Sequence, residues 1–169
     1  MKLSTLPIMH IAYLLIGSNL GDKASYLKNA SSYIQQQCGQ IVKQSSYYET
    51  APWGFTDQPG FLNQALIVQT QLDPAELMQQ LLAIETFMGR TRTIKMGPRI
   101  IDLDILQIDQ IVLDTPLLQL PHPAMHQRKF ALIPMVEIAP ELLHPVIQKT
   151  MTELLQECTD QGDVQKKMI

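Results

Sequence analysis

The chain has 169 residues, of which 46% are hydrophobic and 17% charged, the ordinary balance of one globular domain with a sizeable core. Its net charge of −3 argues against a nucleic-acid partner, and no apolar stretch reaches the roughly 18 residues of a membrane span. The two cysteines match no metal or redox spacing, and the N-terminal MKLSTLPIMHIAYLLIG lacks the pattern of a secretory signal. We therefore expect a cytoplasmic protein with no membrane partner.

The first quarter of the chain predicts a strand, a helix and a second strand. The apolar run His10–Ile16 predicts a strand that ends at Gly17. Apolar residues at helical spacing predict a helix from about Lys23 to Cys38, and Gly39 ends it. A second strand is then expected over about Ile41–Glu49, followed by a turn-rich segment.

A long loop, a third strand and a second helix follow. Residues Thr50–Gly60 contain two prolines and two glycines, which predicts a loop. A third strand is expected over Phe61–Gln71. The helix from about Asp73 to Met88 begins with an Asp-Pro pair, which supplies an N-cap and a proline at the first helical position.

The remaining half begins with a loop and a short strand. The apolar, β-branched run Ile100–Leu106 follows a Gly-Pro turn and predicts this strand. A small hairpin is expected around Ile111–Leu113, and short helices near Ala131–Ile138 and Thr150–Glu157.

This order of elements indicates an α+β fold. Strand, helix, strand, strand, helix, strand is the order of the ferredoxin-like βαββαβ sandwich, an antiparallel sheet with helices packed on it. The C-terminal third would add further strand and helix elements. We assign residues 10–169 to a single domain and residues 1–9 to an N-terminal extension. The fold alone does not decide the function, since it hosts many functions.

Two aspartates interrupt the apolar strand GPRIIDLDIL. Side chains alternate along a strand, so Asp102 and Asp104 share one face, roughly 7 Å apart. The other face carries Ile101, Leu103 and Ile105, which are expected to pack on the core. The carboxylates could form the solvated face of an edge strand, or they could bind a divalent cation, which prefers oxygen ligands.

Basic residues flank the aspartate strand on both sides. They are Arg90, Arg92, Lys95 and Arg99 before it, and His122, Arg128 and Lys129 after it. Each could be an ordinary surface charge, but guanidinium groups match phosphate oxygens, and magnesium usually takes one or two carboxylates together with substrate phosphates. The pattern therefore favours a polyphosphate held by magnesium, with room for two ions.

An aromatic loop lies next to a polar strand start. Trp53 and Phe55 make the Thr50–Gly60 loop too apolar for plain exposure, and Phe61 and Asn63 share a face. An aromatic ring beside an amide suits a flat heterocycle, although core packing and a turn asparagine would give the same pattern. The turn GSNLGD lacks the glycine spacing of a dinucleotide or P-loop phosphate site.

Taken together, these segments resemble the 6-hydroxymethyl-7,8-dihydropterin pyrophosphokinases of folate synthesis. The matching segments are AYLLIGSNLGD, SSYYETAPWG, DQPGFLNQAL, IETFMGRTR, GPRIIDLDIL, LPHPAMHQRKFAL and PMVEIAPELLHP, which keep their order over about residues 10 to 145. The resemblance implies transfer of pyrophosphate from ATP to the hydroxymethyl group of the pterin, with release of AMP. It also implies an in-line attack on the β-phosphorus assisted by two Mg²⁺ ions.

The resemblance also implies roles for individual residues. It makes Asp102 and Asp104 the metal ligands and, with Arg90 and Arg92, the catalytic residues, Asp104 being a candidate proton acceptor. The residues expected near ATP are Glu85, Arg90, Arg92, Arg99, Ile105, His122 and Arg128. The residues expected near the pterin are Thr50, Ala51, Trp53, Phe61, Asn63, Met96, Asp102 and Phe130, with the ring between Phe61 and Phe130.

Some positions depart from the family pattern. Met96 stands where many relatives have tryptophan, Phe61 where tyrosine is frequent, Pro123 where some have tyrosine and Ala51 where a proline occurs. These changes affect affinity more than reaction type, because no metal ligand or triphosphate arginine is lost. The protein is expected to act as a monomer on small molecules.

Two other classes of protein share parts of this pattern. A metal-dependent nuclease or nucleotidyl transferase can also use paired aspartates, but it would need a basic track for a long polyanion. A ferredoxin-like RNA-binding module would need two or three aromatics on the sheet face and no carboxylate pair there. The net charge of −3 and the two aspartates argue against both.

Overall fold

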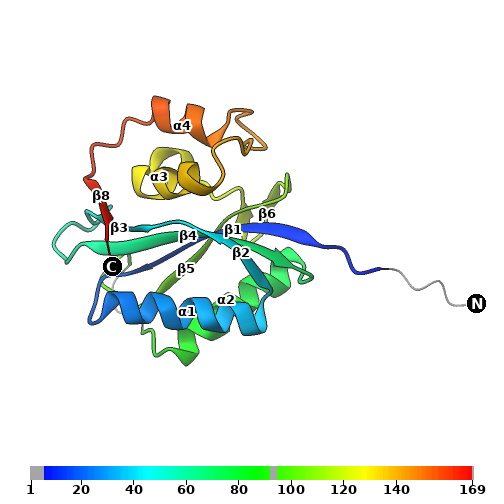
Figure 1. Cartoon of the computed structure of the whole chain (residues 1–169), viewed down its shortest axis with the longest axis horizontal. Helices are drawn as coiled ribbons and strands as arrows, with labels where there is room; N and C mark the ends of the chain where they lie inside the picture. Colours follow the sequence, from blue (N-terminus) through cyan, green and yellow to red (C-terminus); the bar gives the residue numbers. More distant parts are fainter. Residues whose placement is uncertain (1–5, 92–94, 169) are drawn as a thin grey trace, which may run out of the picture.

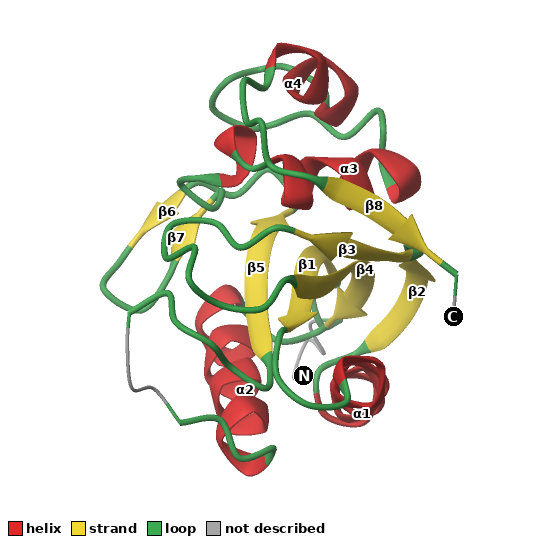
Figure 2. Cartoon of the chain, turned by 90° about the vertical axis from the view of Figure 1, so that its left-hand side faces the viewer, coloured by secondary structure: helices red, strands yellow, loops and turns green. Residues whose placement is uncertain are grey.

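A six-stranded antiparallel sheet forms the centre of the protein, in a computed structural model that describes residues 6–91 and 95–168. Its strands follow the order β5-β1-β4-β3-β8, and β2 also pairs with β4 (Figure 2). The strands are β1 (His10–Ser18), β2 (Gln40–Gln44), β3 (Tyr47–Thr50), β4 (Phe61–Thr70), β5 (Asp102–Ile108) and β8 (Val164–Lys167). A separate two-stranded ribbon joins β6 (Leu113–Asp114) and β7 (Gln119–Leu120).

Helices cover both faces of the sheet. They are α1 (Lys23–Gln37), α2 (Pro74–Phe87), α3 (Lys129–Ile138) and α4 (Met151–Glu157), with a 3₁₀ turn, η1 (Met125–Gln127), before α3. Figure 1 shows α1 and α2 on one face and α3 and α4 on the other. The predicted ferredoxin-like βαββαβ order is confirmed, and α3, α4 and β8 are the expected C-terminal additions. Among the described residues, no helix is long and apolar enough to cross a membrane.

Strand alternation divides the apolar residues between two cores. On β1, Leu14 and Ile16 pack towards α1 and α2, while Leu15 packs towards α3 and α4. The core under α1 and α2 also contains Ile101, Leu103 and Ile105, as predicted from the aspartate strand. The face of β5 that carries Asp102 and Asp104 therefore points to the α3 side of the sheet.

The start of α2 is built as its sequence predicts. The Asp73 carboxylate accepts a hydrogen bond from the Glu76 N–H at 2.8 Å, and the Glu76 carboxylate accepts one from the Asp73 N–H at 3.1 Å. This capping box satisfies two backbone donors that the helix itself cannot pair. Pro74 occupies the first helical position, where its missing N–H costs nothing.

The strand predicted over Ile41–Glu49 is in fact two strands. β2 pairs with the second half of β4 and β3 with its first half. Between them, the Ser45 hydroxyl accepts from the Ala65 N–H at 2.9 Å, and the Ser46 N–H donates to the Glu137 carboxylate of α3. One backbone bond remains at the break, from the Ser45 N–H to the Ala65 carbonyl at 2.9 Å, and side chains supply the two bonds just described. A strand pattern in the sequence does not reveal this break.

Candidate functional site

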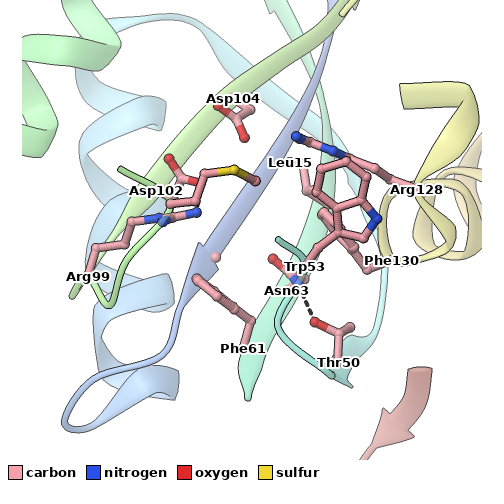
Figure 3. A pocket seen from close by; sticks show the side chains of 12 residues that line it. Leu15, Thr50, Trp53, Phe61, Asn63, Arg99, Asp102, Asp104, Arg128 and Phe130 are labelled. Atoms are coloured by element: carbon pink, nitrogen blue, oxygen red, sulfur yellow. Dashed lines mark hydrogen bonds and ion pairs between the residues drawn. The ribbon is translucent and has the colours of Figure 1, made fainter. Parts of the chain in front are cut away.

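The two aspartates of β5 line one pocket, as their spacing predicts (Figure 3). β5 is an edge strand, because β1 is the one strand that pairs with it among residues 6–91 and 95–168. The aspartate face is nevertheless not an ordinary solvated surface, since Asp102 and Asp104 are only partly exposed and lie among aromatic and basic side chains. The two aspartates therefore lie on an edge strand and also line a pocket.

We call this cavity the aromatic pocket. It is lined by Leu15, Gly17, Thr50, Trp53, Phe61, Asn63, Met96, Arg99, Asp102, Asp104, Arg128 and Phe130. Every residue expected near the pterin belongs to this set except Ala51, which is exposed and whose N–H donates to the Asp163 carbonyl at 3.0 Å. Segments that are far apart in the sequence thus meet at one cavity.

Arginines cover the aromatic rings of this pocket. The Arg99 guanidinium carbon lies 4.9 Å from the centre of the Phe61 ring. The guanidinium carbon of Arg128 lies 4.6 Å from the Trp53 ring centre and 5.6 Å from that of Phe130. Such contacts are attractive because a ring face carries partial negative charge. Each predicted stacking surface therefore already has a cation over it.

Both oxygens of the Asp102 carboxylate are ion-paired. Arg90 Nη1 lies 2.9 Å from Oδ1, and Arg99 Nη2 lies 3.2 Å from Oδ2. The same Arg90 nitrogen lies 2.6 Å from Glu85 Oε2, so this guanidinium bridges two carboxylates. Two predicted phosphate-binding arginines therefore neutralise a predicted metal ligand.

The Glu85 carboxylate binds the backbone of the edge strand β5. Its side chain is buried and accepts a hydrogen bond from the Leu103 N–H at 2.8 Å. Leu103 stands between the two aspartates, so the Glu85 carboxylate takes the place of a neighbouring strand at this point. Burial raises the pKa of Glu85, while the Leu103 N–H and Arg90 act in the opposite direction. Glu85 does not line either cavity described here, and its expected contact with ATP stays a prediction.

Asp104 lies where two cavities meet. Besides the aromatic pocket, it lines a second cavity of about 660 Å³, which we call the open groove. Burial, followed by the charge of Asp102, raises the pKa of Asp104, against the opposing effect of Arg128. A nearby cation would favour the charged form and lower this pKa.

The open groove holds part of the expected ATP site. It is lined by Met78, Asp104, Ile105, Asp114, Thr115, Pro116, Leu117, Leu118, Gln119, His122 and Pro123. Of the residues expected near ATP, Ile105 and His122 lie here, and Arg99 and Arg128 lie in the adjoining aromatic pocket. Arg92 lies outside the described residues.

His122 is held as a neutral hydrogen-bond donor. Burial, together with the charge of Arg128, lowers its pKa to about 4. Its Nδ1 accepts from the Ala124 N–H at 3.1 Å, which leaves the proton on Nε2. A neutral imidazole in this state can donate to a phosphate oxygen without changing charge.

The carboxylate pair fits magnesium better than a transition metal. Among residues 6–91 and 95–168, no group of three or more His, Cys, Asp and Glu side chains could enclose a metal ion. Magnesium needs no such enclosure, because it keeps water and substrate phosphates as ligands beside one or two carboxylates. Asp102 and Asp104 supply this kind of donor set.

The structure adds a buried asparagine that sequence patterns missed. Asn19, in the GSNLGD turn, donates to Gln58 Oε1 at 2.9 Å and to the Pro59 carbonyl at 3.0 Å, and it accepts from the Arg99 N–H at 2.9 Å. The turn therefore ties the Thr50–Gly60 loop to the segment before β5. The only signal in the sequence was an asparagine directly after a buried strand.

Comparison with known proteins identifies the class of enzyme that this site defines. The site joins an aromatic pocket and an open groove at a shared carboxylate, which gives two adjoining sites for small molecules. The sequence model of the family described as 7,8-dihydro-6-hydroxymethylpterin-pyrophosphokinase matches residues 13–140. The chain belongs to this family.

Individual relatives agree with this assignment. The chain is 42% identical over 134 residues to the 2-amino-4-hydroxy-6-hydroxymethyldihydropteridine pyrophosphokinase of Bacillus subtilis, covering 79% of this chain and 80% of that protein. The protein of the same name from Aquifex aeolicus is 40% identical over 151 residues, covering 89% and 94% of the two chains. Neither alternative class, nuclease or RNA-binding module, is supported.

Longer proteins contain a similar region. The folic acid synthesis protein fol1 of Schizosaccharomyces pombe is 38% identical over 153 residues, which is 90% of this chain and 21% of that protein. A Plasmodium falciparum HPPK-DHPS structure superposes with a TM-score of 0.75 over 92% of this chain and 43% of that one, at 17% identity. At this identity the superposition supports the fold alone, and the chain spans less than half of both longer proteins.

Proposed function

We propose that the chain transfers the β,γ-diphosphate of ATP to the hydroxymethyl group of 6-hydroxymethyl-7,8-dihydropterin and releases AMP, as its family does. The observation that carries this proposal is the position of Asp104, which lines both the aromatic pocket and the open groove. A pterin in the pocket and a nucleotide in the groove would therefore present their reacting groups to the same carboxylate.

The aromatic pocket is the proposed pterin site. Phe61 on β4 and Phe130 on α3 supply ring surfaces, and the Asn63 amide supplies hydrogen bonds to the edge of the heterocycle. Trp53 and Met96 would cover the ring from the two loops. Because arginines lie over these rings in the structure, substrate binding requires the guanidinium groups to move.

The open groove is the proposed nucleotide site. Its volume of about 660 Å³ lies within the usual range for small-molecule sites. Neutral His122 can donate to a phosphate oxygen, and Arg99 and Arg128 line the adjoining aromatic pocket. Arg90 now pairs with Asp102 and would turn towards the phosphates when ATP binds, joined by Arg92.

The reaction is an in-line displacement at phosphorus. The pterin hydroxyl oxygen forms a bond to the β-phosphorus, the bond from this phosphorus to the α,β-bridging oxygen breaks, and AMP leaves. Asp104 would accept the hydroxyl proton. Two Mg²⁺ ions held by Asp102 and Asp104 would offset the charge of the phosphates. The arginines would stabilise the charge that builds on the bridging oxygen.

Three further expectations remain proposals. Residues 10–169 act as one domain, with residues 1–9 as an extension. The protein works as a monomer, and it works in the cytoplasm, where its two cysteines remain unpaired as in the structure.

The first test measures AMP formation. Purified protein is incubated with ATP and Mg²⁺, with and without 6-hydroxymethyl-7,8-dihydropterin, and AMP is quantified by chromatography. We expect AMP only when the pterin is present. AMP at the same rate without pterin, or none from folded protein, would refute the proposed reaction.

Binding can be followed separately from turnover. Trp53 is the only tryptophan of the chain and lines the aromatic pocket. We expect pterin to change its fluorescence in a saturable manner. A titration with ATP and no magnesium provides the control for nucleotide binding. No change on addition of pterin would contradict the placement of the ring in this pocket.

A further inference from the structure

Gly17 lies in the sheet between two predicted site residues. In the antiparallel register, it is opposite Asn63 of β4 on one side and Asp102 of β5 on the other. All three line the aromatic pocket. The end of β1 therefore forms the part of the pocket wall that lies between the Asn63 amide and the Asp102 carboxylate.

The space above Gly17 is already filled by the Asn63 amide. A Cβ at position 17 would lie 2.3 Å from Asn63 Oδ1, 3.4 Å from its Cγ and 3.6 Å from the Leu62 carbonyl oxygen. A contact of 2.3 Å is not possible, so any side chain here must displace the amide. The backbone at Gly17 is not left-handed, so a glycine is needed for space and not for conformation.

The amide is held from its other end by Thr50. Asn63 Nδ2 donates to Thr50 Oγ1 at 2.8 Å, and both side chains are almost fully buried (Figure 3). With its NH₂ group engaged by the hydroxyl, the amide presents its oxygen over Gly17. That oxygen can accept a hydrogen bond from a ring N–H of a bound heterocycle.

We propose that Gly17 is a positioning residue for the Asn63 amide, and that Gly17 and Thr50 together orient this amide as an acceptor for a ring N–H. Residue 17 then decides whether the pocket can take a flat heterocycle with a donor on this edge. The inference deepens the proposed function, on which it rests for the choice of ligand. Gly17 need not touch the ligand itself, because its effect passes through Asn63.

A double-mutant cycle tests this coupling. The wild type, Gly17→Ala, Asn63→Ala and the double variant are compared by the Kd for 6-hydroxymethylpterin from Trp53 fluorescence, and by the KM values for pterin and ATP from AMP formation. We expect Gly17→Ala to raise the pterin Kd at least tenfold and to change the ATP KM less than twofold. In the Asn63→Ala background, the same methyl group should change the pterin Kd less than threefold.

Ser18→Ala is the matched control within the strand. Ser18 is the next residue of β1, is fully buried and is not part of the pocket lining. Its replacement should leave the pterin Kd within twofold of wild type. A large effect of Ser18→Ala would show that any disturbance of β1 weakens binding, and this would overturn the specific role of Gly17.

A second pair of variants tests the other end of the amide. Thr50→Val removes the hydroxyl with little change in shape and should raise the pterin Kd several-fold. Thr50→Ser keeps the hydroxyl and should therefore keep most of the wild-type affinity. Circular dichroism and thermal unfolding confirm that each variant is folded. If Gly17→Ala does not fold, equal binding by the valine and serine variants overturns the proposal.

The remaining outcomes separate this inference from the proposed function. A wild type that binds pterin and forms AMP, with a Gly17→Ala variant of equal affinity, overturns the inference alone. Equal losses from Gly17→Ala in both Asn63 backgrounds do the same, because the methyl group would then act directly on the ligand or the strand. A folded wild type that neither binds pterin nor forms AMP overturns both.

Discussion

Removal of the Asn19 side chain should loosen the Thr50–Gly60 loop and the segment that leads into β5. The asparagine is almost fully buried, and its amide makes three hydrogen bonds, to Gln58, Pro59 and Arg99. At about 1 kcal/mol for each bond, Asn19→Ala should lower the free energy of unfolding by about 3 kcal/mol. For a chain of this size, that corresponds to a fall in Tm of about 6–12 °C.

The assay combines stability with kinetics. Urea unfolding followed by circular dichroism gives the free energy of unfolding, and AMP formation gives the KM for the pterin. We expect this KM to rise several-fold, because the Gln58 loop carries Trp53 and the Arg99 segment leads to Asp102. Asn19→Asp keeps the acceptor for the Arg99 N–H but places a buried carboxylate oxygen against the Gln58 and Pro59 oxygens, so it should not recover the stability lost in the alanine variant.

Asn29→Ala is the matched control, because Asn29 is exposed on α1. Its replacement should change the free energy of unfolding by less than about 0.5 kcal/mol. A loss of less than about 1 kcal/mol in Asn19→Ala would show that these three hydrogen bonds do not stabilise the fold. A variant that is destabilised as expected but keeps the wild-type pterin KM would show that Asn19 does not position the site.

Three further predictions concern the ionisable groups of the site. Asp102→Ala or Asp104→Ala should abolish AMP formation in a folded protein. A wild-type rate in either variant would contradict the assignment of that aspartate as a metal ligand. Arg92→Ala should slow single-turnover AMP formation with little change in pterin Kd; a large loss of binding at a normal rate would contradict its role. The pKa of His122 is lowered from 6.5 to about 4, so between these pH values the unfolded chain binds a proton that the folded protein does not, and stability falls as the pH falls. His122→Gln should therefore lose less stability than wild type between pH 6.5 and 4, by up to about 3 kcal/mol, in urea unfolding at several pH values, and equal losses would contradict the assignment.

Local sequence patterns correctly predicted the features that depend only on residues close together in the chain. The Asp-Pro start of α2 is confirmed, because a capping box depends only on residues within one turn. The shared face of Asp102 and Asp104 is confirmed for the same reason, since alternation is a property of a single strand. The ferredoxin-like order followed from the sequence of elements, and the family resemblance agreed with it.

Features that depend on distant partners were missed or left open. The break between β2 and β3 depends on Glu137 of α3, and the function of the GSNLGD turn depends on the loops that Asn19 holds. The bridge from Arg90 to Glu85 and Asp102 likewise joins a helix, a loop and a strand. The contacts of Asn19 and Glu137 join residues 39 to 91 positions apart, and the bridge at Arg90 forms only because the chain turns back between α2 and β5.

The order of the main helices and strands, the face that carries the aspartates and the family resemblance could all be read from the sequence, because they depend on local periodicity and on motifs of fixed spacing. The position of Asp104 between the aromatic pocket and the open groove could not be read from the sequence, nor could the room that Gly17 leaves for the Asn63 amide. Cavities and close contacts of this kind arise where strands distant in the sequence become neighbours. Their geometry depends on sheet register and side-chain volume, which are settled only when the whole chain has folded.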